Sequence, residues 1–412
     1  MNFLYNILLV SLLASNKFVV TICFSINGDF VKKSIRTNNH HRHFTFYLSL
    51  SSSNDSKQLK ESAQPDDLTE MDSEGPMKLT SPLKFIGPYP CVSLHFPELA
   101  TSSQREREVA GISLDFVLDT AANTNTINAQ VAAELKLEDV GSSLPGYNAA
   151  GAMDGATTFM LGDCTLDLPE KELFMKDLTA SALPVASPAA AGLLGTAFLN
   201  CFQGGVKFDW MDDASVTFFG DDVGLEAELD VMKKAPIKII KDVLLPSIVL
   251  KINGKEIRAL LDTGSPISVL NSSAAKLAGL NVIEILGDQK SESDENKGGF
   301  VNPFKKVFDS VKEANSLAQA AARGDVLLIG GIAGQPVQLL RTQDNANICI
   351  QGAAEDISFP QSKVYVGDLP GLAALGGLDG DASPPAAILG MDILRQKSSM
   401  FYRMNEVFFP ED

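Results

Sequence analysis

Histidine is scarce in this sequence. The chain has four histidines among 412 residues, and His40, His41 and His43 lie close together near the N-terminus. Only His95 remains for the rest of the chain. A Ser-His-Asp or Cys-His catalytic site would depend on that one residue, and a zinc site built mainly from histidine is excluded. We expect His95 to be an ordinary strand residue, because it stands in a segment of alternating apolar and polar residues.

Closely spaced cysteines, a basic charge and a phosphate-binding glycine loop are missing as well. The five cysteines form no Cys-x-x-Cys motif, so we interpret them as buried thiols rather than as disulfide partners. The net charge of −17 argues against binding to nucleic acid, which requires a basic face. No glycine motif of the P-loop or dinucleotide-binding type occurs. We therefore expect no cofactor, no metal and no nucleic-acid partner.

The first apolar run of the chain is short. Residues 3–14 are mostly apolar, but a helix needs about 20 such residues to span a bilayer. Residues 1–24 resemble a signal peptide, and residues 25–76 combine a composition similar to a transit peptide with an acidic linker. We expect entry into the secretory pathway and delivery to a plastid through this bipartite leader. Secretion, or residence in the endomembrane lumen, is the alternative, and an N-terminal membrane anchor is less favoured.

A repeated pattern centred on an aspartate organises the remaining chain. The segments FVLDTAANTNTIN, residues 116–128, and ALLDTGSPISVLN, residues 259–271, both carry Asp-Thr after an apolar run. In both, an asparagine follows nine residues after the aspartate. A predicted hairpin precedes each segment, and an alanine-rich helical stretch, a glycine-bearing segment and an apolar-apolar-Gly element follow it. This ordered recurrence indicates an internal duplication.

The duplication predicts a mostly β chain with two similar lobes. The first lobe spans residues 77–220, the second spans residues 236–412, and residues 221–235 link them. The second copy is longer because of an insertion at residues 286–325, which begins as a charged loop and continues as a predicted helix over 302–324. We expect this helix to pack against the second lobe, and a lid over a cleft is the alternative.

Two carboxyl groups on symmetry-related loops have a specific chemistry if the lobes bring them together. At about 3 Å, two carboxyl groups cannot both ionise, so the pair shares one proton. One member can then act as a base toward water, and the other as an acid toward a carbonyl oxygen. Such a pair, here Asp119 and Asp262, would hydrolyse an amide without histidine, metal or a covalent nucleophile.

The second copy resembles the retropepsin-type aspartic proteases. The run Leu261-Asp262-Thr263-Gly264-Ser265 matches the signature of that family, and the apolar-apolar-Gly element at residues 388–394 follows at a suitable distance. The resemblance covers most of residues 236–410 and, through the duplication, residues 80–220. It implies a bilobal acid-protease fold with two pseudo-twofold-related β-barrel lobes, one short helix in each lobe and an extra helix in the second.

The resemblance also implies a role for each matching residue. Asp119 and Asp262 would form the catalytic dyad that holds the attacking water. Thr120 and Thr263 would join the two loops. The family's remaining positions correspond to Gly264 and Ser265 beside the Asp262 carboxyl, to the flap residues Gly151, Gly330, Gly331 and Gly334, and to the structural glycines Gly195 and Gly390. The flaps would close over an extended peptide that is bound by strand addition.

The first copy departs from the signature at Ala121, where the family has glycine. The added methyl group lies where two loops would approach closely. Three functions therefore stay open: an aspartic endopeptidase that uses Asp119 and Asp262, a peptide-binding protein without catalytic activity, and a protease active only as a dimer through Asp262. All three bind a polypeptide. Because the first needs only one chain, we expect a monomer, with a homodimer as the alternative.

Overall fold

The computed structural model describes residues 78–411 with gaps at 108–109, 143–145, 149–150, 154–155, 168–170, 183–188, 212, 241–242, 284–316, 331–335 and 377–383. It also describes six strands nearer the N-terminus: β1 (Phe3–Ile7), β2 (Val10–Ala14), β3 (Lys17–Thr21), β4 (Cys23–Ile26), β5 (Asp29–Val31) and β6 (Tyr47–Ser52). Strand β1 runs antiparallel to β6 and parallel to β16 (Lys171–Ala182) of the first lobe.

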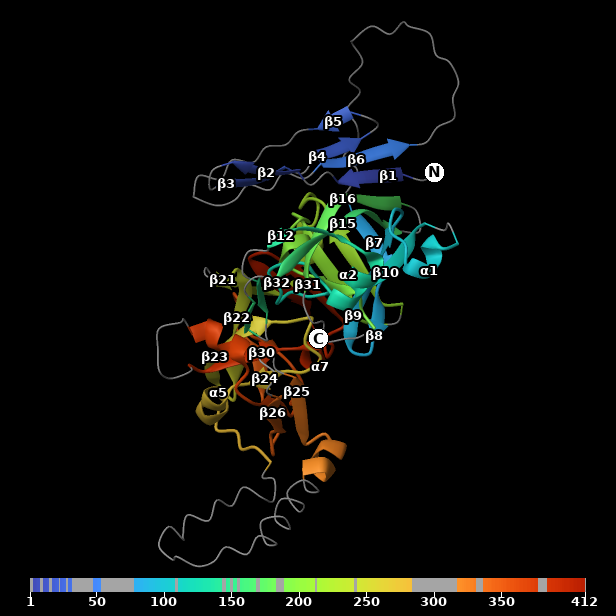
Figure 1. The fold of residues 1–412 in the computed structure, drawn as a ribbon. Coiled ribbons are helices and arrows are strands. Elements are labelled where there is room, and N and C mark those ends of the chain that lie inside the picture. Colours follow the sequence, from blue (N-terminus) through green and yellow to red (C-terminus); the bar gives the residue numbers. More distant parts are fainter. Residues whose placement is uncertain are drawn as a thin grey trace, which may run out of the picture.

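Two lobes, each built on its own sheet, form the body of the molecule (Figure 1). Besides β16, the sheet of the first lobe contains β8 (Lys84–Ile86), β9 (Tyr89–Phe96), β10 (Ile112–Leu118), β11 (Thr126–Ile127), β12 (Glu138–Ser142), β15 (Thr157–Asp167) and β17 (Gly192–Leu194). The sheet of the second lobe contains β21 (Lys238–Ile240), β22 (Leu245–Ile252), β23 (Lys255–Leu261), β24 (Val269–Leu270), β25 (Val326–Gly330), β26 (Pro336–Arg341), β27 (Ile348–Ile350), β28 (Ile357–Ser358), β29 (Tyr365–Val366) and β30 (Ala386–Leu389). This arrangement confirms the predicted mostly β, bilobal fold.

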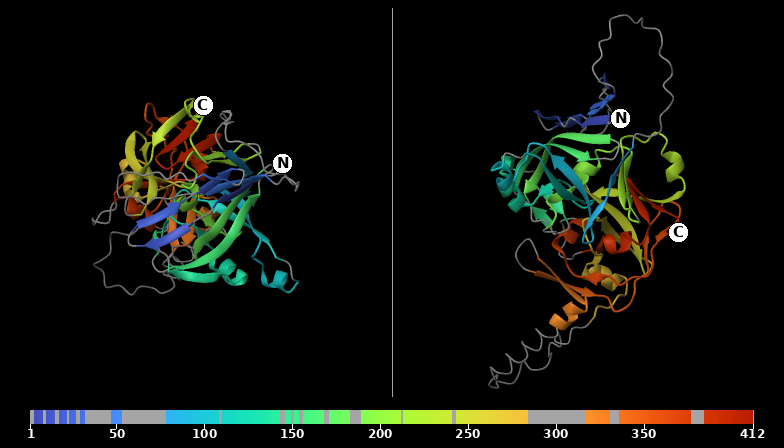
Figure 2. Two further views of the ribbon diagram at one scale, coloured as in Figure 1. Left: turned by 90° about the horizontal axis from the view of Figure 1, so that it is seen from above. Right: turned by 90° about the vertical axis from the view of Figure 1, so that its right-hand side faces the viewer.

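A third sheet joins the lobes. Its six strands are β7 (Lys78–Pro82), β18 (Gly205–Asp209), β19 (Ser215–Phe219), β20 (Met232–Pro236), β31 (Ser399–Arg403) and β32 (Glu406–Pro410). The junction is the antiparallel pair β18–β31, in which Phe208 lies opposite Met400. In the right-hand view of Figure 2, the green strands of the first lobe lie above the orange and red strands of the second.

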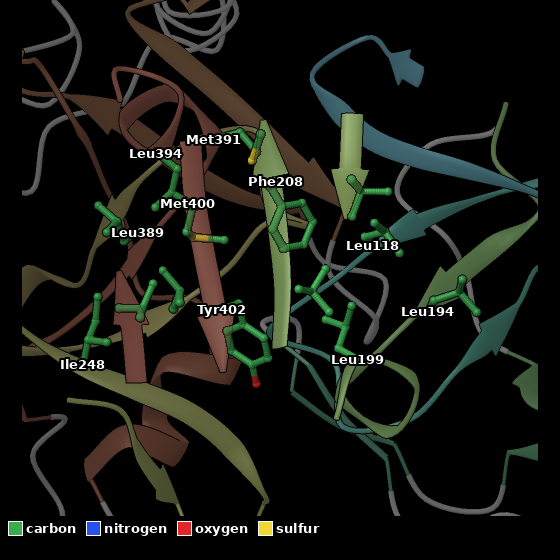
Figure 3. Close-up of a cluster of buried hydrophobic side chains, with 14 of the residues drawn as sticks. Leu118, Leu194, Leu199, Phe208, Ile248, Leu389, Met391, Leu394, Met400 and Tyr402 are labelled. Carbon is green, nitrogen blue, oxygen red and sulfur yellow. The ribbon is translucent and has the colours of Figure 1, made fainter. Parts of the chain in front are cut away.

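The main hydrophobic core is continuous across this third sheet. Phe208 and Tyr402 lie on neighbouring strands at its centre, between Leu118 and Leu194 of the first lobe and Ile248 and Leu389 of the second (Figure 3). All of these side chains are buried. Because burial of apolar area is the main stabilising contribution to folding, the two lobes are expected to stabilise each other rather than fold as independent units.

Each lobe begins with the predicted antiparallel hairpin. In the second lobe, β22 and β23 are joined by Asn253 and Gly254, both with positive φ, 50° and 76°. Asn-Gly suits this turn because both central positions are left-handed. In the first lobe, the corresponding pair β9–β10 is joined by a longer loop that contains the short helix α1 (Ser102–Arg105). His95 lies in β9, as expected for a strand residue.

The repeated asparagine begins the helix that follows each Asp-Thr segment. Asn128 caps α2 (Ala129–Leu135), and Asn271 caps α5 (Ser272–Leu277). The described residues also contain α3 (Thr196–Leu199), α4 (Glu226–Leu229), the 3-10 helix η1 (Pro370–Gly376) and α7 (Met391–Leu394). The expected short helix of each lobe is α2 or α5, and the closing corners of both lobes form further single helical turns, α3 and α7.

Several other expectations concern particular segments. Of the helix predicted over 302–324, residues 317–324 lie within the described part of the chain. Residues 317–322 are helical, and the helix stops before Gly324, whose φ is 72°. Four described cysteines are unpaired: Cys91 and Cys164 are buried as expected, whereas Cys201 and Cys349 are partly exposed. Within the described residues, every helix is too short or too polar to cross a membrane.

Candidate active site

Asp119 and Asp262 follow directly after equivalent strands. Asp119 comes after β10, and its N–H donates to the carbonyl oxygen of Leu194 at 3.0 Å. Asp262 comes after β23, and its N–H donates to the carbonyl oxygen of Leu389 at 3.1 Å. In each lobe the acceptor belongs to a strand that runs parallel to the one before the aspartate. The two aspartate loops therefore leave their sheets in the same way.

Thr120 and Thr263 join the two loops through reciprocal hydrogen bonds. The N–H of each threonine donates to the Oγ1 of the other at 3.1 Å. Thr120 Oγ1 donates to the carbonyl oxygen of Leu261 at 2.6 Å, and Thr263 Oγ1 donates to that of Leu118 at 2.7 Å. Both threonines are fully buried, so water does not compete for these bonds. This twofold arrangement fixes the separation and orientation of the loops that carry the aspartates.

The carboxyl groups of Asp119 and Asp262 lie against each other between the loops. Both residues are buried, with exposures of 6% and 3%, and a side-chain hydrogen bond links them. The Asp119 carboxyl also lies over Gly264, where a methyl group in place of hydrogen would overlap it. Within the described chain, Oδ1 of Asp262 has no hydrogen-bond partner from the protein.

The surroundings of the two carboxyl groups raise both pKa values, to different extents. Burial raises the pKa of Asp119 to about 6, although hydrogen bonds from the backbone N–H groups of Ala121 and Ala122 lower it. Burial raises the pKa of Asp262 well above its ordinary value, and the negative charge of Asp119 raises it further. The hydrogen bond between the carboxyl groups lowers the pKa of Asp119 and raises that of Asp262. Both carboxyl groups therefore resist ionisation, and the pair as a unit holds one proton near neutral pH.

Ala121 occupies the position of the missing glycine without disrupting its loop. Its N–H donates to Asp119 Oδ1 at 2.7 Å, and its φ is not among the positive values found in the described chain. Its side chain, 1% exposed, belongs to a buried cluster whose other fully buried members all come from the second lobe. The methyl group therefore contributes to packing between the lobes, and the backbone retains its hydrogen bond to the aspartate.

Gly195 and Gly390 lie directly against the backbone of the two aspartate loops. Each precedes a single helical turn, α3 or α7. A side chain at Gly195 would overlap the backbone carbonyls of Ala122 and Thr124, and one at Gly390 would overlap that of Ile267. Glycine is required here by close approach of backbone to backbone, since neither residue has a positive φ.

One pair of supporting residues was not predicted from the sequence. Asn125 Oδ1 accepts the N–H of Gly195 at 3.2 Å, and Ser268 Oγ accepts the N–H of Gly390 at 2.9 Å. Both residues stand six positions after an aspartate, so the duplication contained a signal for them. Because asparagine and serine differ in size and chemistry, only their shared hydrogen-bond function reveals the equivalence.

The glycine-bearing segments of both lobes include short hairpins. Gly151 begins β14 (Gly151–Met153), which pairs with β13 (Gly146–Asn148) and contacts η1 of the second lobe. Gly330 ends β25, which pairs with β26. Gly331 and Gly334 lie outside the described residues. Among the described residues no cluster of potential metal ligands occurs.

Comparison with known proteins agrees with the resemblance seen in the second copy. Residues 248–295 match the aspartyl protease family. This aspartyl protease segment includes Asp262, Thr263, Gly264 and Ser265, whereas Asp119 lies outside it and is joined to it by the threonine hydrogen bonds. No curated protein sequence matches the chain.

Solved structures similar to this chain include seed globulins and a protease. Conglutin gamma, a basic 7S globulin from lupine seeds, is 10% identical, with 82% of this chain and 95% of that chain covered and a TM-score of 0.42. Basic 7S globulin from soybean is 10% identical, with 82% and 97% covered and a TM-score of 0.39. A retropepsin-like aspartic protease from Rickettsia conorii is 17% identical, with 35% and 90% covered and a TM-score of 0.21.

Proposed function

We propose that this protein is an aspartic endopeptidase that hydrolyses peptide bonds with the Asp119 and Asp262 pair. The observation that carries the proposal is the direct hydrogen bond between two buried carboxyl groups on loops joined by reciprocal threonine bonds. Charged Asp119 accepts a proton from the attacking water, and protonated Asp262 donates a hydrogen bond to the carbonyl oxygen of the scissile bond. No covalent intermediate with the protein is formed.

The substrate in this proposal is an extended polypeptide bound between the aspartate loops and the glycine-bearing hairpins. An extended peptide suits this proposal because its backbone can pair with the edges of neighbouring strands. Both aspartates come from one chain, which supports a monomeric enzyme. The packing of Ala121 supports catalysis rather than loss of it, because the backbone bond from Ala121 to Asp119 is retained.

The proposal is tested with the purified full chain and unfolded casein as substrate between pH 3 and 7. Asp119→Asn and Asp262→Asn should each lower kcat/KM by at least about 100-fold, since each removes one half of the acid–base pair. Asp344→Asn, at an exposed site, is the matched control and should leave activity unchanged. Wild-type activity should also be blocked by a statine-type inhibitor.

Two results would contradict the proposal in different ways. Full activity in either aspartate variant would show that the pair is not the catalyst. Absence of cleavage by the wild type at every pH, together with measurable peptide binding, would favour a non-catalytic peptide-binding protein. In that case Ala121→Gly tests whether the methyl group is the cause, because it would restore cleavage.

A further inference from the structure

The strand that begins the predicted hairpin of each lobe contains a repeat that the sequence pattern alone does not reveal. Strand β9 reads YPCVSLHF and strand β22 reads LPSIVLKI, both eight residues with proline in second place. Cys91 lies opposite Val117, two residues before Asp119, and Ser247 lies opposite Leu260, two residues before Asp262. Tyr89 is therefore the first-lobe equivalent of Leu245.

Leu245 lies in an apolar environment. It is 1% exposed and belongs to the same buried cluster as Ala121. The first residue of β22 therefore belongs to the buried cluster that also contains the methyl group of Ala121. The Leu245 side chain therefore presents no polar group to a bound peptide.

Tyr89 lies in a different environment at the equivalent position. Its side chain is half-buried and packs beside Val117 and Leu193. Tyr89 stands two positions before Cys91, so both side chains project from the same face of β9. Continued by two residues, the register of β9 with β10 brings Tyr89 level with Asp119, and the pKa of Tyr89 is raised by burial and then by the negative charge of Asp262. The pseudo-twofold partner of Ala121 is Gly264, against which the Asp119 carboxyl lies.

The hairpin that carries Tyr89 is held by the second lobe. Ile86 pairs with Tyr89 across a turn in which Gly87 has a φ of 61°. The guanidinium of Arg395, at the end of α7, lies 4.3 Å from the ring centre of Phe85 on the same hairpin. This cation–π contact fixes the hairpin relative to the second lobe. The phenol of Tyr89 is thus attached to a positioned element.

We propose that Tyr89 is a substrate-positioning residue that makes the peptide-binding region beside the carboxyl pair polar on its first-lobe side only. Its hydroxyl donates a hydrogen bond to a carbonyl or polar side chain of the bound peptide, whereas Leu245, packed with Ala121, offers none at the equivalent place. A peptide is therefore bound in one direction across a nearly symmetric pair of carboxyl groups. The inference rests on the proposed function, because it assumes that peptide occupies the cleft beside the dyad.

The test compares the wild-type full chain with Tyr89→Phe, which removes the hydroxyl, and Tyr89→Leu, which copies the second-lobe residue. A library of peptides with polar or aliphatic residues on either side of one cleavage site is digested, and products are identified by mass spectrometry. Wild type should prefer a polar residue on one side. Both variants should lose that preference through about a tenfold rise in KM for the preferred peptides, with kcat nearly unchanged.

Tyr402→Phe is the matched control, because the Tyr402 phenol is 1% exposed and cannot contact a peptide. It should retain the preference of the wild type. An unchanged preference and KM in Tyr89→Phe would overturn the inference while leaving the dyad proposal intact.

A binding measurement separates the inference from the proposed activity. A labelled statine-type peptide is titrated into wild type and Tyr89→Phe and followed by fluorescence anisotropy. About tenfold weaker binding in the variant supports the inference even if the wild type cleaves nothing. Equal binding, or no binding to either protein, overturns it.

Discussion

At the scale of single residues, Asp119 and Asp262 combine burial with mutual repulsion. Neither carboxyl group can be fully hydrated, and ionisation of both would place two negative charges in contact. Backbone N–H groups of Ala121 and Ala122 favour the charge on Asp119. The proximity of the two buried carboxyl groups therefore makes the state in which both are charged unfavourable for the stability of the folded protein.

This cost predicts a stability that depends on pH. The pKa of Asp119 is about 6 in the folded protein and lower in the unfolded chain, where the ordinary value of 3.8 applies. A raised folded pKa stabilises the protein at low pH, and that stabilisation is lost as pH rises through about 6. Relative to the double variant Asp119→Asn, Asp262→Asn, the wild type should lose at least about 2 kcal/mol of unfolding free energy between pH 4 and 7.5, because Asp262 adds to the contribution of Asp119.

Urea unfolding of both proteins at several pH values measures this difference. A difference between wild type and double variant that stays constant over the range would show that the carboxyl groups keep ordinary pKa values. It would also argue against the shared proton.

At the scale of elements, the asparagine that caps the helix after each aspartate loop makes different contacts in the two lobes. Asn128 caps α2 through the N–H of Gln130 at 2.9 Å. Asn271 caps α5 through the N–H of Ala274 at 2.8 Å, and it also accepts the N–H of Ala386 and donates to the carbonyl of Pro384. Asn271, 2% exposed, therefore joins α5 to the strand that supports the Asp262 loop.

This difference predicts unequal effects of the same substitution. Asn271→Ala should destabilise the protein by about 3 kcal/mol, because it removes the cap and leaves buried backbone groups without partners. Asn128→Ala, the matched control, should cost only about 1 kcal/mol as the loss of a partly exposed cap. Chemical denaturation measures both, and equal losses would contradict the argument.

The sequence predicted these elements more completely than their connections. The spacing of nine residues from aspartate to asparagine placed both helices, and Asn253-Gly254 placed one hairpin turn. The equivalence of Tyr89 with Leu245 was not visible, because a loop of different length separates each from its aspartate. Pairing register, which depends on long-range hydrogen bonds, was needed to align them.

At the scale of the whole molecule, the third sheet makes the lobes mutually dependent. Strand β18 hydrogen-bonds to β31 along Val206–Asp209, and the aromatic residues on both strands are buried. Separation of the lobes would expose this surface and break the reciprocal threonine bonds at the same time. Catalytic geometry and global stability therefore depend on the same interface.

We expect residues 77–230 and 231–412, produced separately, to be aggregated or poorly structured. Mixed during refolding, they should form a one-to-one complex, because each supplies strands that the other lacks. Circular dichroism and gel filtration measure the outcome. Two stable, folded monomers without affinity for each other would contradict this view of the interface.

The sequence by itself determined the duplication, the mostly β class and the two candidate aspartates, because local patterns of apolar residues, turns and Asp-Thr runs repeat along the chain. It left the effect of Ala121 open, since a methyl group can either disturb a close approach or fill an apolar space. Tertiary structure decided that point by packing Ala121 with second-lobe residues and joining the loops through Thr120 and Thr263. The raised pKa values of the pair also arise there, because burial and the proximity of the two carboxyl groups exist only after the lobes meet.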